Sequence, residues 1–122
     1  MKRILLVDDD QYIRDVYEEV LVESGYKVEV AIDGKDGLDK IQAGGYDLVL
    51  LDVMMPYIDG IGILAELMEN KPKVPNGPIM ILSNLAHDQI IDEAIAKGAA
   101  ICFNKADLNP DELVEKVKEI LK

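Results

Sequence analysis

The sequence is poor in cysteine and has no long apolar run. Its single cysteine, Cys102, excludes an internal disulfide and favours a reducing compartment, and its apolar neighbours suggest a small buried side chain rather than a reactive thiol. The N-terminal apolar stretch is too short for a signal peptide, and no segment approaches the length of a membrane span. We therefore expect a cytoplasmic protein without membrane segments.

Basic residues are also scarce. The chain has 13 Lys and Arg against 24 Asp and Glu, for a formal net charge of −11, and the bases form no cluster. This charge repels nucleic acid and anionic membranes, so we expect no direct binding to either. At 122 residues, 49% hydrophobic and 30% charged, the chain has the size and composition of one globular domain, which we assign to residues 1–122.

Five apolar runs of strand length recur along the chain. They are Ile4 to Val7, Val28 to Ala31, Leu48 to Leu51, Ile79 to Leu82, and Ala99 to Phe103. Apolar stripes at helical spacing follow at Ile13–Leu21 and Leu113–Leu121, and weaker helical patterns lie near Asp36–Ile41 and Ile61–Met68. Strands that alternate with helices run parallel, with helices on both faces of the sheet. The pattern predicts an α/β fold of five βα units.

Capping residues support this division. Gly25 and Gly98 stand where helices are expected to end, and the segment Asn109–Glu112 combines an Asn cap, Pro at the first helical position and Glu at the third. Leu48 to Leu51, a continuous apolar run, is typical of a central strand buried on both faces.

Polar residues follow the predicted strands at their carboxyl ends, where open parallel sheets gather functional groups. Asp8 and Asp9 follow the first run, Asp52 the third and Ser83 the fourth, and Lys105 comes two residues after the fifth. If the first and third strands are neighbours, three carboxylates converge. Two carboxylates about 5 Å apart repel by roughly 3 kcal/mol, so a cation is needed, and a part-hydrated Mg²⁺ suits these oxygen ligands.

The same residues suit phosphoryl transfer. Asp52 supplies an anionic nucleophile, Ser83 a hydroxyl donor and Lys105 a positive charge for a phosphoryl oxygen. Each residue alone has a simpler explanation: Asp8 or Asp9 as a helix cap, Ser83 as a loop serine, Lys105 as a solvated side chain. The prediction depends on all five falling at strand ends in this order.

The chain resembles the receiver domain of two-component response regulators over essentially its whole length. The segments that carry the resemblance are ILLVDDD, DLVLLDVMMPYIDG, IMILS and FNK. The resemblance implies a flavodoxin-like, doubly wound three-layer sandwich with a parallel five-stranded sheet of order 2-1-3-4-5.

The resemblance also implies roles for the acidic residues. Asp52 would be the phosphoacceptor, phosphorylated by a histidine kinase or histidine phosphotransfer protein through a mixed acyl phosphate. Asp9 and Asp52 would bind Mg²⁺ directly together with the backbone carbonyl of Met54, while Asp8 would hold a coordinated water. Such a domain is not an enzyme that acts on other molecules, since it catalyses only its own phosphorylation and slow self-dephosphorylation.

Ser83 and Lys105 would contact the phosphoryl oxygens, and the face formed by the fourth helix, fifth strand and fifth helix would bind an output partner that the sequence does not identify. The chain departs from the family pattern at three positions: Cys102 replaces a frequent aromatic, Ala106 replaces the proline after the lysine, and Asn84 replaces a small residue.

Met54 and Leu85 stand where the family tunes the lifetime of the phosphate. Neither side chain activates water, which predicts slow self-dephosphorylation.

Three alternatives stay open. A Mg²⁺-dependent aspartyl phosphatase would carry a second Asp two residues after the nucleophile, where this chain has Met54. A flavodoxin-like module would bind phosphate on the loop after the first strand, where the aspartates of this chain would repel it. The third alternative is an interaction module of the same fold that works without phosphorylation. The sequence is equally compatible with a stand-alone receiver and with part of a longer regulator.

Overall fold

A computed structural model describes residues 1–53, 55, 58–83, 88–104 and 108–122. Strands and helices alternate along the chain, as predicted. The strands are β1 Arg3–Val7, β2 Lys27–Ala31, β3 Leu48–Asp52, β4 Ile79–Ser83 and β5 Ile101–Asn104. The helices are α1 Gln11–Glu23, α2 Gly34–Ala43, α3 Gly60–Glu69, α4 Asp88–Ala96 and α5 Pro110–Ile120.

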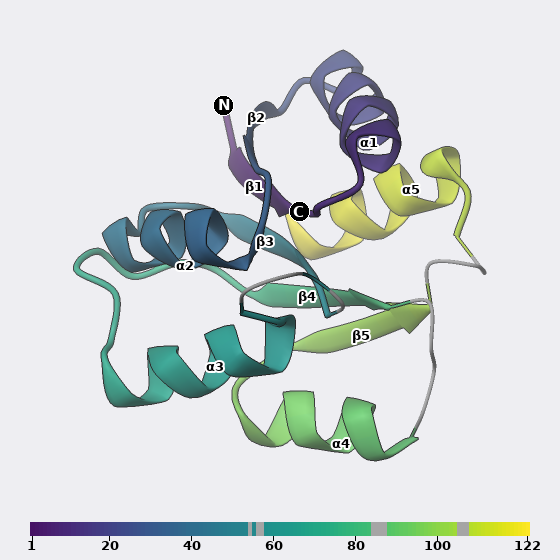
Figure 1. Cartoon of the computed structure of the whole chain (residues 1–122). Helices are drawn as coiled ribbons and strands as arrows, with labels where there is room; N and C mark the ends of the chain where they lie inside the picture. The colour runs from purple at the N-terminus through teal and green to yellow at the C-terminus, as the bar shows by residue number, and fades with distance from the viewer. Residues whose placement is uncertain (54, 56–57, 84–87, 105–107) are drawn as a thin grey trace.

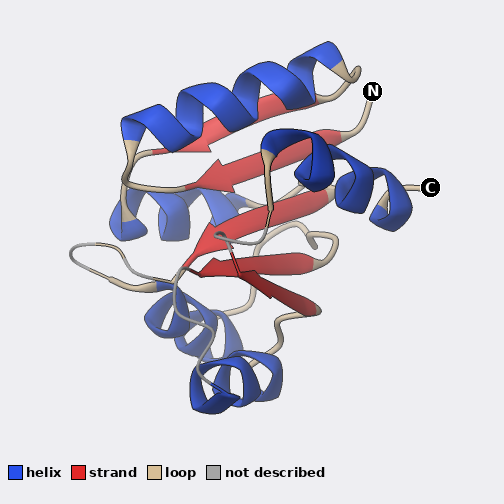
Figure 2. Cartoon of the chain, turned by 90° about the vertical axis from the view of Figure 1, so that its right-hand side faces the viewer, coloured by secondary structure: helices blue, strands red, loops and turns tan. Residues whose placement is uncertain are grey.

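The strands form one parallel sheet in the order β2-β1-β3-β4-β5. Helices α1 and α5 pack together on one face, and α2, α3 and α4 cover the other (Figure 1). Figure 2 shows the strand arrowheads directed toward one end of the sheet. The three-layer, flavodoxin-like architecture and its strand order are therefore confirmed.

The sheet separates two hydrophobic cores. Val49 and Leu51 of β3 face the core under α2, α3 and α4, whereas Leu48 and Leu50 face the core under α1 and α5. All four side chains have no exposed surface, because β3 lies at the centre of the sheet with helices on both faces. The continuous apolar run that marked this strand in the sequence is thus explained by burial on two sides.

Side-chain caps fix where the helices begin. Asp10 accepts hydrogen bonds from the backbone N–H groups of Tyr12 and Ile13 at the start of α1, and Asn109 forms a complete capping box with Glu112 at α5. Asn109 and its capping box confirm the prediction for α5. Among the described residues, no helix combines the length and apolarity that a membrane crossing requires.

The ends of several elements differ from the predicted runs. The fifth strand begins at Ile101 rather than Ala99, because Ala99 donates its N–H back to the carbonyl of Ala94 and so lies in the turn that follows α4. Helices α2 and α3 extend beyond their apolar patterns at both ends. Their starts are set by Asp33 and Asp59, whose carboxylates cap the first turns.

Arg3, Glu29 and Tyr46 form a polar cluster at the start of β1. Arg3 pairs with Glu29 at 3.0 Å and lies over the ring of Tyr46, 4.7 Å from its centroid. The Tyr46 hydroxyl donates to the Glu29 carboxylate at 2.7 Å. This bond lowers the pKa of Glu29, and burial together with the same bond raises the pKa of Tyr46 to about 12.

Candidate functional site

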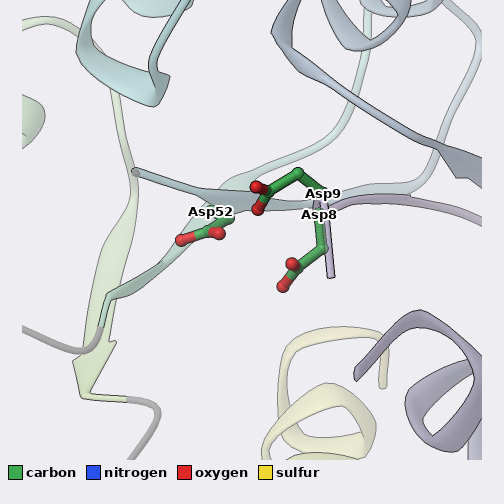
Figure 3. Close-up of side chains that lie close together, drawn as sticks. All are labelled: Asp8, Asp9 and Asp52. Atoms are coloured by element: carbon green, nitrogen blue, oxygen red, sulfur yellow. The ribbon is translucent and has the colours of Figure 1, made fainter. Parts of the chain in front are cut away.

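The register of the sheet brings the acidic residues together. Val7 of β1 stands opposite Leu51 of β3, and the next residues in the two strands' direction are Asp8 and Asp52. The first and third strands are therefore neighbours. Carboxylate oxygens of Asp8, Asp9 and Asp52 lie within 4.8 Å of one another at this end of the sheet (Figure 3).

Two of these carboxylates are taken out of bulk water. Asp8 is 1% exposed and Asp52 is 6% exposed, whereas Asp9 is exposed. The backbone N–H of Asp10 donates to Oδ1 of Asp8 at 2.9 Å. Because Asp10 caps α1, neither Asp8 nor Asp9 is occupied as the cap of that helix. The simpler explanation of these two residues as helix caps is thereby removed.

Arg14 stabilises the backbone of the acidic loop and was not recognised from the sequence. Its Nη1 donates to the carbonyl oxygen of Asp8 at 2.9 Å from the first turns of α1. The signal available in the sequence was its position, one helical turn beyond the Asp10 cap, where a long side chain can reach back over the loop. A charged donor at this carbonyl holds β1 and α1 in a fixed relation at the site.

Gly60 lets the chain fold back against the end of β3. Its N–H donates to the carbonyl of Val53 at 2.9 Å. A Cβ at this position would lie 2.7 Å from the carbonyl oxygen of Asp52 and 2.9 Å from the Cα of Val53. Only glycine fits this approach without displacing the backbone that carries Asp52.

The three carboxylates form a donor set for a hard cation. Unit negative charges about 4.8 Å apart repel by roughly 3 kcal/mol per pair at an effective dielectric near 20, so a divalent cation among them relieves a large repulsion. Clustered carboxylates that leave room for water suit Mg²⁺, which seldom takes an all-protein shell. The residues present therefore fit a Mg²⁺ ion.

The remaining predicted site residues are only partly covered by the described structure. Ser83 ends β4, next to β3 in the sheet, but its side chain lies outside the described part. Met54 and Lys105 also lie outside the described residues, as do Asn84, Leu85 and Ala106. Lys105 follows Asn104, the last residue of β5.

The family model described as the response regulator receiver domain matches residues 4–118. The chain belongs to this family. It is a receiver domain of two-component response regulators, a signalling family rather than an enzyme family of the usual kind. Response regulators act together with histidine kinases and output domains. The phosphatase and phosphate-binding flavodoxin-like alternatives lose their support with this assignment.

Known relatives of this receiver domain differ in length. It is 32% identical over 123 residues to the chemotaxis protein CheY of Treponema pallidum, covering 98% of this chain and 83% of that protein. It is 34% identical over 125 residues to the transcriptional regulatory protein PcoR of Escherichia coli, covering all of this chain and 52% of that protein. The chain thus spans about half the length of some of the regulators that it matches.

A solved structure is also similar. The response regulator protein TrrA from Thermotoga maritima, in complex with Mg(2+)-BeF, superposes with a TM-score of 0.80 at 38% identity, covering 98% of this receiver domain and 99% of that chain. The likeness therefore extends over the acidic site and both helical layers.

Proposed function

We propose that Asp52 is the phosphoacceptor of this receiver domain. The observation that carries the proposal is the position of Asp52 at the exit of the buried central strand, with the carboxylates of Asp8 and Asp9 beside it. An oxygen of Asp52 attacks the phosphorus of a phosphohistidine. A new P–O bond forms, the P–N bond breaks and the released imidazole nitrogen takes up a proton, which leaves a mixed acyl phosphate on Asp52.

The acidic residues hold Mg²⁺ in this proposal. Asp9 and Asp52 are direct ligands together with the backbone carbonyl of Met54, and Asp8 holds a coordinated water. The hydrogen bond from the Asp10 N–H keeps one oxygen of Asp8 directed along the loop, and the Arg14 contact keeps that loop against α1. When bound, the ion supplies the positive charge that neutralises the transferring phosphoryl group. The solved relative with Mg(2+)-BeF supports this choice of metal.

Two further residues act on the phosphoryl group. Ser83 donates its hydroxyl to one phosphoryl oxygen, and Lys105 pairs with another as a point charge. These roles are supported by the positions of the two residues in the chain. Ser83 ends β4 and Lys105 follows β5, and these two strands come directly after β3 in the order of the sheet.

Phosphorylation is proposed to alter the α4–β5–α5 face, which then binds an output protein or domain. The donor is a histidine kinase or a histidine phosphotransfer protein. Residues 1–122 act as one domain, which the single sheet with its two cores supports. We place this activity in the cytoplasm, in keeping with the free Cys102.

The test is intact-mass measurement after incubation with acetyl phosphate and Mg²⁺. We expect the wild type to gain the mass of one phosphoryl group and Asp52→Asn to gain none. Asp10→Asn is the matched control, because it removes a neighbouring charge yet keeps a good helix cap. No gain in the wild type, or an equal gain in Asp52→Asn, would overturn the assignment.

Self-dephosphorylation is proposed to be slow, because the side chains of Met54 and Leu85 provide no group that activates water. The same mass measurement followed over time tests this. Loss of the Asp52 phosphate within seconds in Mg²⁺ would contradict it.

A further inference from the structure

A groove of about 410 Å³ lies at the end of the sheet opposite to the acidic site. Leu64, Leu67 and Met68 of α3 form one wall, and the loop from α3 to β4 forms the other. Ile79, the first residue of β4, and Gly98, which precedes β5, also line the groove. The groove is therefore at the amino ends of β4 and β5, whereas Asp8 and Asp52 stand at carboxyl ends.

The loop wall is rigid. It runs from residue 70 to 78, longer than most connections between a helix and a strand, and carries prolines at 72, 75 and 78. The Asn76 side chain accepts from the N–H of Tyr46 and donates to the carbonyl of Ile41, each at 3.0 Å. Lys73 donates its N–H to the carbonyl of Gln42 at 2.9 Å.

Gly77 brings this loop against the preceding crossover. Its N–H donates to the carbonyl of Tyr46 at 2.7 Å, and a Cβ on Gly77 would lie 1.9 Å from the carbonyl oxygen of Asp47. These contacts order the α3–β4 loop in the unbound protein, so the loop loses little conformational entropy when a partner binds.

The groove differs in charge from the rest of the molecule. Lys71 and Lys97 line it and no acidic residue does, although the chain carries 24 acids against 13 bases. In the described part of the chain the ion pairs are Arg3–Glu29 and Lys40–Asp36, so neither groove lysine is paired with a carboxylate there. An apolar lining that also carries these two ammonium groups complements apolar side chains flanked by carboxylates.

The open form of the groove favours a protein segment over a small molecule. Met68 is 58% exposed, and Lys71, Pro75 and Pro78 are also exposed, so the walls do not enclose a compact ligand. Pockets for small molecules usually bury most of the ligand surface. Leu64, which is 1% exposed, is a firmly packed part of the α3 wall against which an inserted side chain can pack.

We propose that this α3–β4 groove docks a segment of a partner protein in which apolar side chains are flanked by Asp or Glu. The apolar side chains pack on Leu67, Met68 and Ile79, and the carboxylates pair with Lys71 and Lys97. Since the groove lies away from the acidic site, docking does not depend on the phosphorylation of Asp52.

The test is a titration of the ¹⁵N-labelled whole chain with short peptides that carry paired leucines or phenylalanines between glutamates. We expect amide shifts at Leu67, Met68, Ile79 and Gly98. Peptides with lysine in place of glutamate, or serine in place of the apolar residues, should bind at least about tenfold more weakly. If no acidic apolar peptide shifts these amides at millimolar concentration, or if the lysine peptides bind equally well, the groove is not such a docking site.

Charge-reversal variants sharpen the test. The double variant Lys71→Glu with Lys97→Glu should raise the Kd for the glutamate peptides at least about tenfold. The matched control, Lys118→Glu with Lys122→Glu on the other side of the molecule, makes the same change in net charge and should leave the Kd within about twofold. An equal loss in both doubles would overturn the assignment of the two lysines. Both doubles should still gain a phosphoryl group from acetyl phosphate, which separates this proposal from that for Asp52.

Discussion

Val7 of β1 and Leu51 of β3 are register partners in the parallel ladder, and each is followed directly by an aspartate, Asp8 after Val7 and Asp52 after Leu51. The pairing of two apolar residues thus decides where the charged residues meet. The hydrophobic effect fixes the register, because both apolar side chains lie in the same core. Burial of these apolar side chains therefore holds the carboxylates close together despite their mutual repulsion.

Mg²⁺ should stabilise the folded chain, and Asp9→Asn should blunt that effect. A ligand that binds only the folded state at about 100 times its Kd adds roughly 2.7 kcal/mol to the free energy of unfolding. Removing one of three clustered carboxylates weakens the site and also relieves repulsion when the metal is absent. Thermal unfolding with and without Mg²⁺ measures both changes. Asp10→Asn should keep the wild-type response, and a full response in Asp9→Asn would show that the metal binds elsewhere.

Gly60→Ala should destabilise the fold by about 1–3 kcal/mol and slow the phosphorylation of Asp52. The new Cβ would meet backbone atoms of Asp52 and Val53, which cannot move without shifting the end of β3. Gly62→Ala in the same helix is the control, because its Cβ meets only side-chain atoms of Ile58 and Asp59. Because alanine favours a helix over glycine, urea unfolding should show the control no more than about 0.5 kcal/mol less stable than the wild type. Equal stability of the two variants would contradict this explanation.

Tyr46→Phe should flatten the loss of stability at high pH. Folding raises the pKa of Tyr46 from 10.0 to about 12, so the folded state holds the phenolic proton more tightly than the unfolded state. This contribution is complete below pH 10 and is lost as the pH rises from 10 toward 12. The difference in free energy of unfolding between wild type and variant, measured across this range, should shrink with rising pH. A constant difference would refute the role assigned to the Tyr46–Glu29 bond.

Asn76→Ala should cost about 1–3 kcal/mol, because it leaves the N–H of Tyr46 and the carbonyl of Ile41 without the side chain that satisfies both. Asn70→Ala, which removes an exposed 3.4 Å contact with Glu66, should change stability by less than about 0.5 kcal/mol. Chemical denaturation of the two variants gives the comparison. If Asn70→Ala proved as costly as Asn76→Ala, the proposed anchoring of the α3–β4 loop would be wrong.

The sequence was most informative where one physical force acted alone. Leu48–Leu51 has no polar residue. In a chain whose strands alternate with helices, such a run is expected in the middle of a parallel sheet, where both faces are buried. The capping residue Asn109 was likewise readable, because it acts on backbone groups a few residues away. The meeting of Asp8, Asp9 and Asp52 followed once the order of the strands was assumed.

Features that depend on tertiary contacts were not predictable. The alanines at 99 and 100 looked like the start of a strand, yet the N–H of Ala99 bonds back to α4. Arg14 reads in the sequence as an ordinary helical arginine, and only the fold directs it to the Asp8 carbonyl. Similarly, nothing in the sequence indicated that Asn76 ties the α3–β4 loop to the preceding crossover, because both partners of its side chain lie far away along the chain.

Cys102 and Phe103 are adjacent on β5 but face opposite layers. Cys102 packs toward the core under α2, α3 and α4, where burial raises the pKa of its thiol, and Phe103 packs toward the core under α1 and α5 with Lys116 over its ring. The chain contains one cysteine, one phenylalanine and no tryptophan. A thiol-attached label and a fluorinated phenylalanine would therefore give two spectroscopic reporters, one residue apart, that observe the two sides of the molecule separately and without any background signal of the same kind.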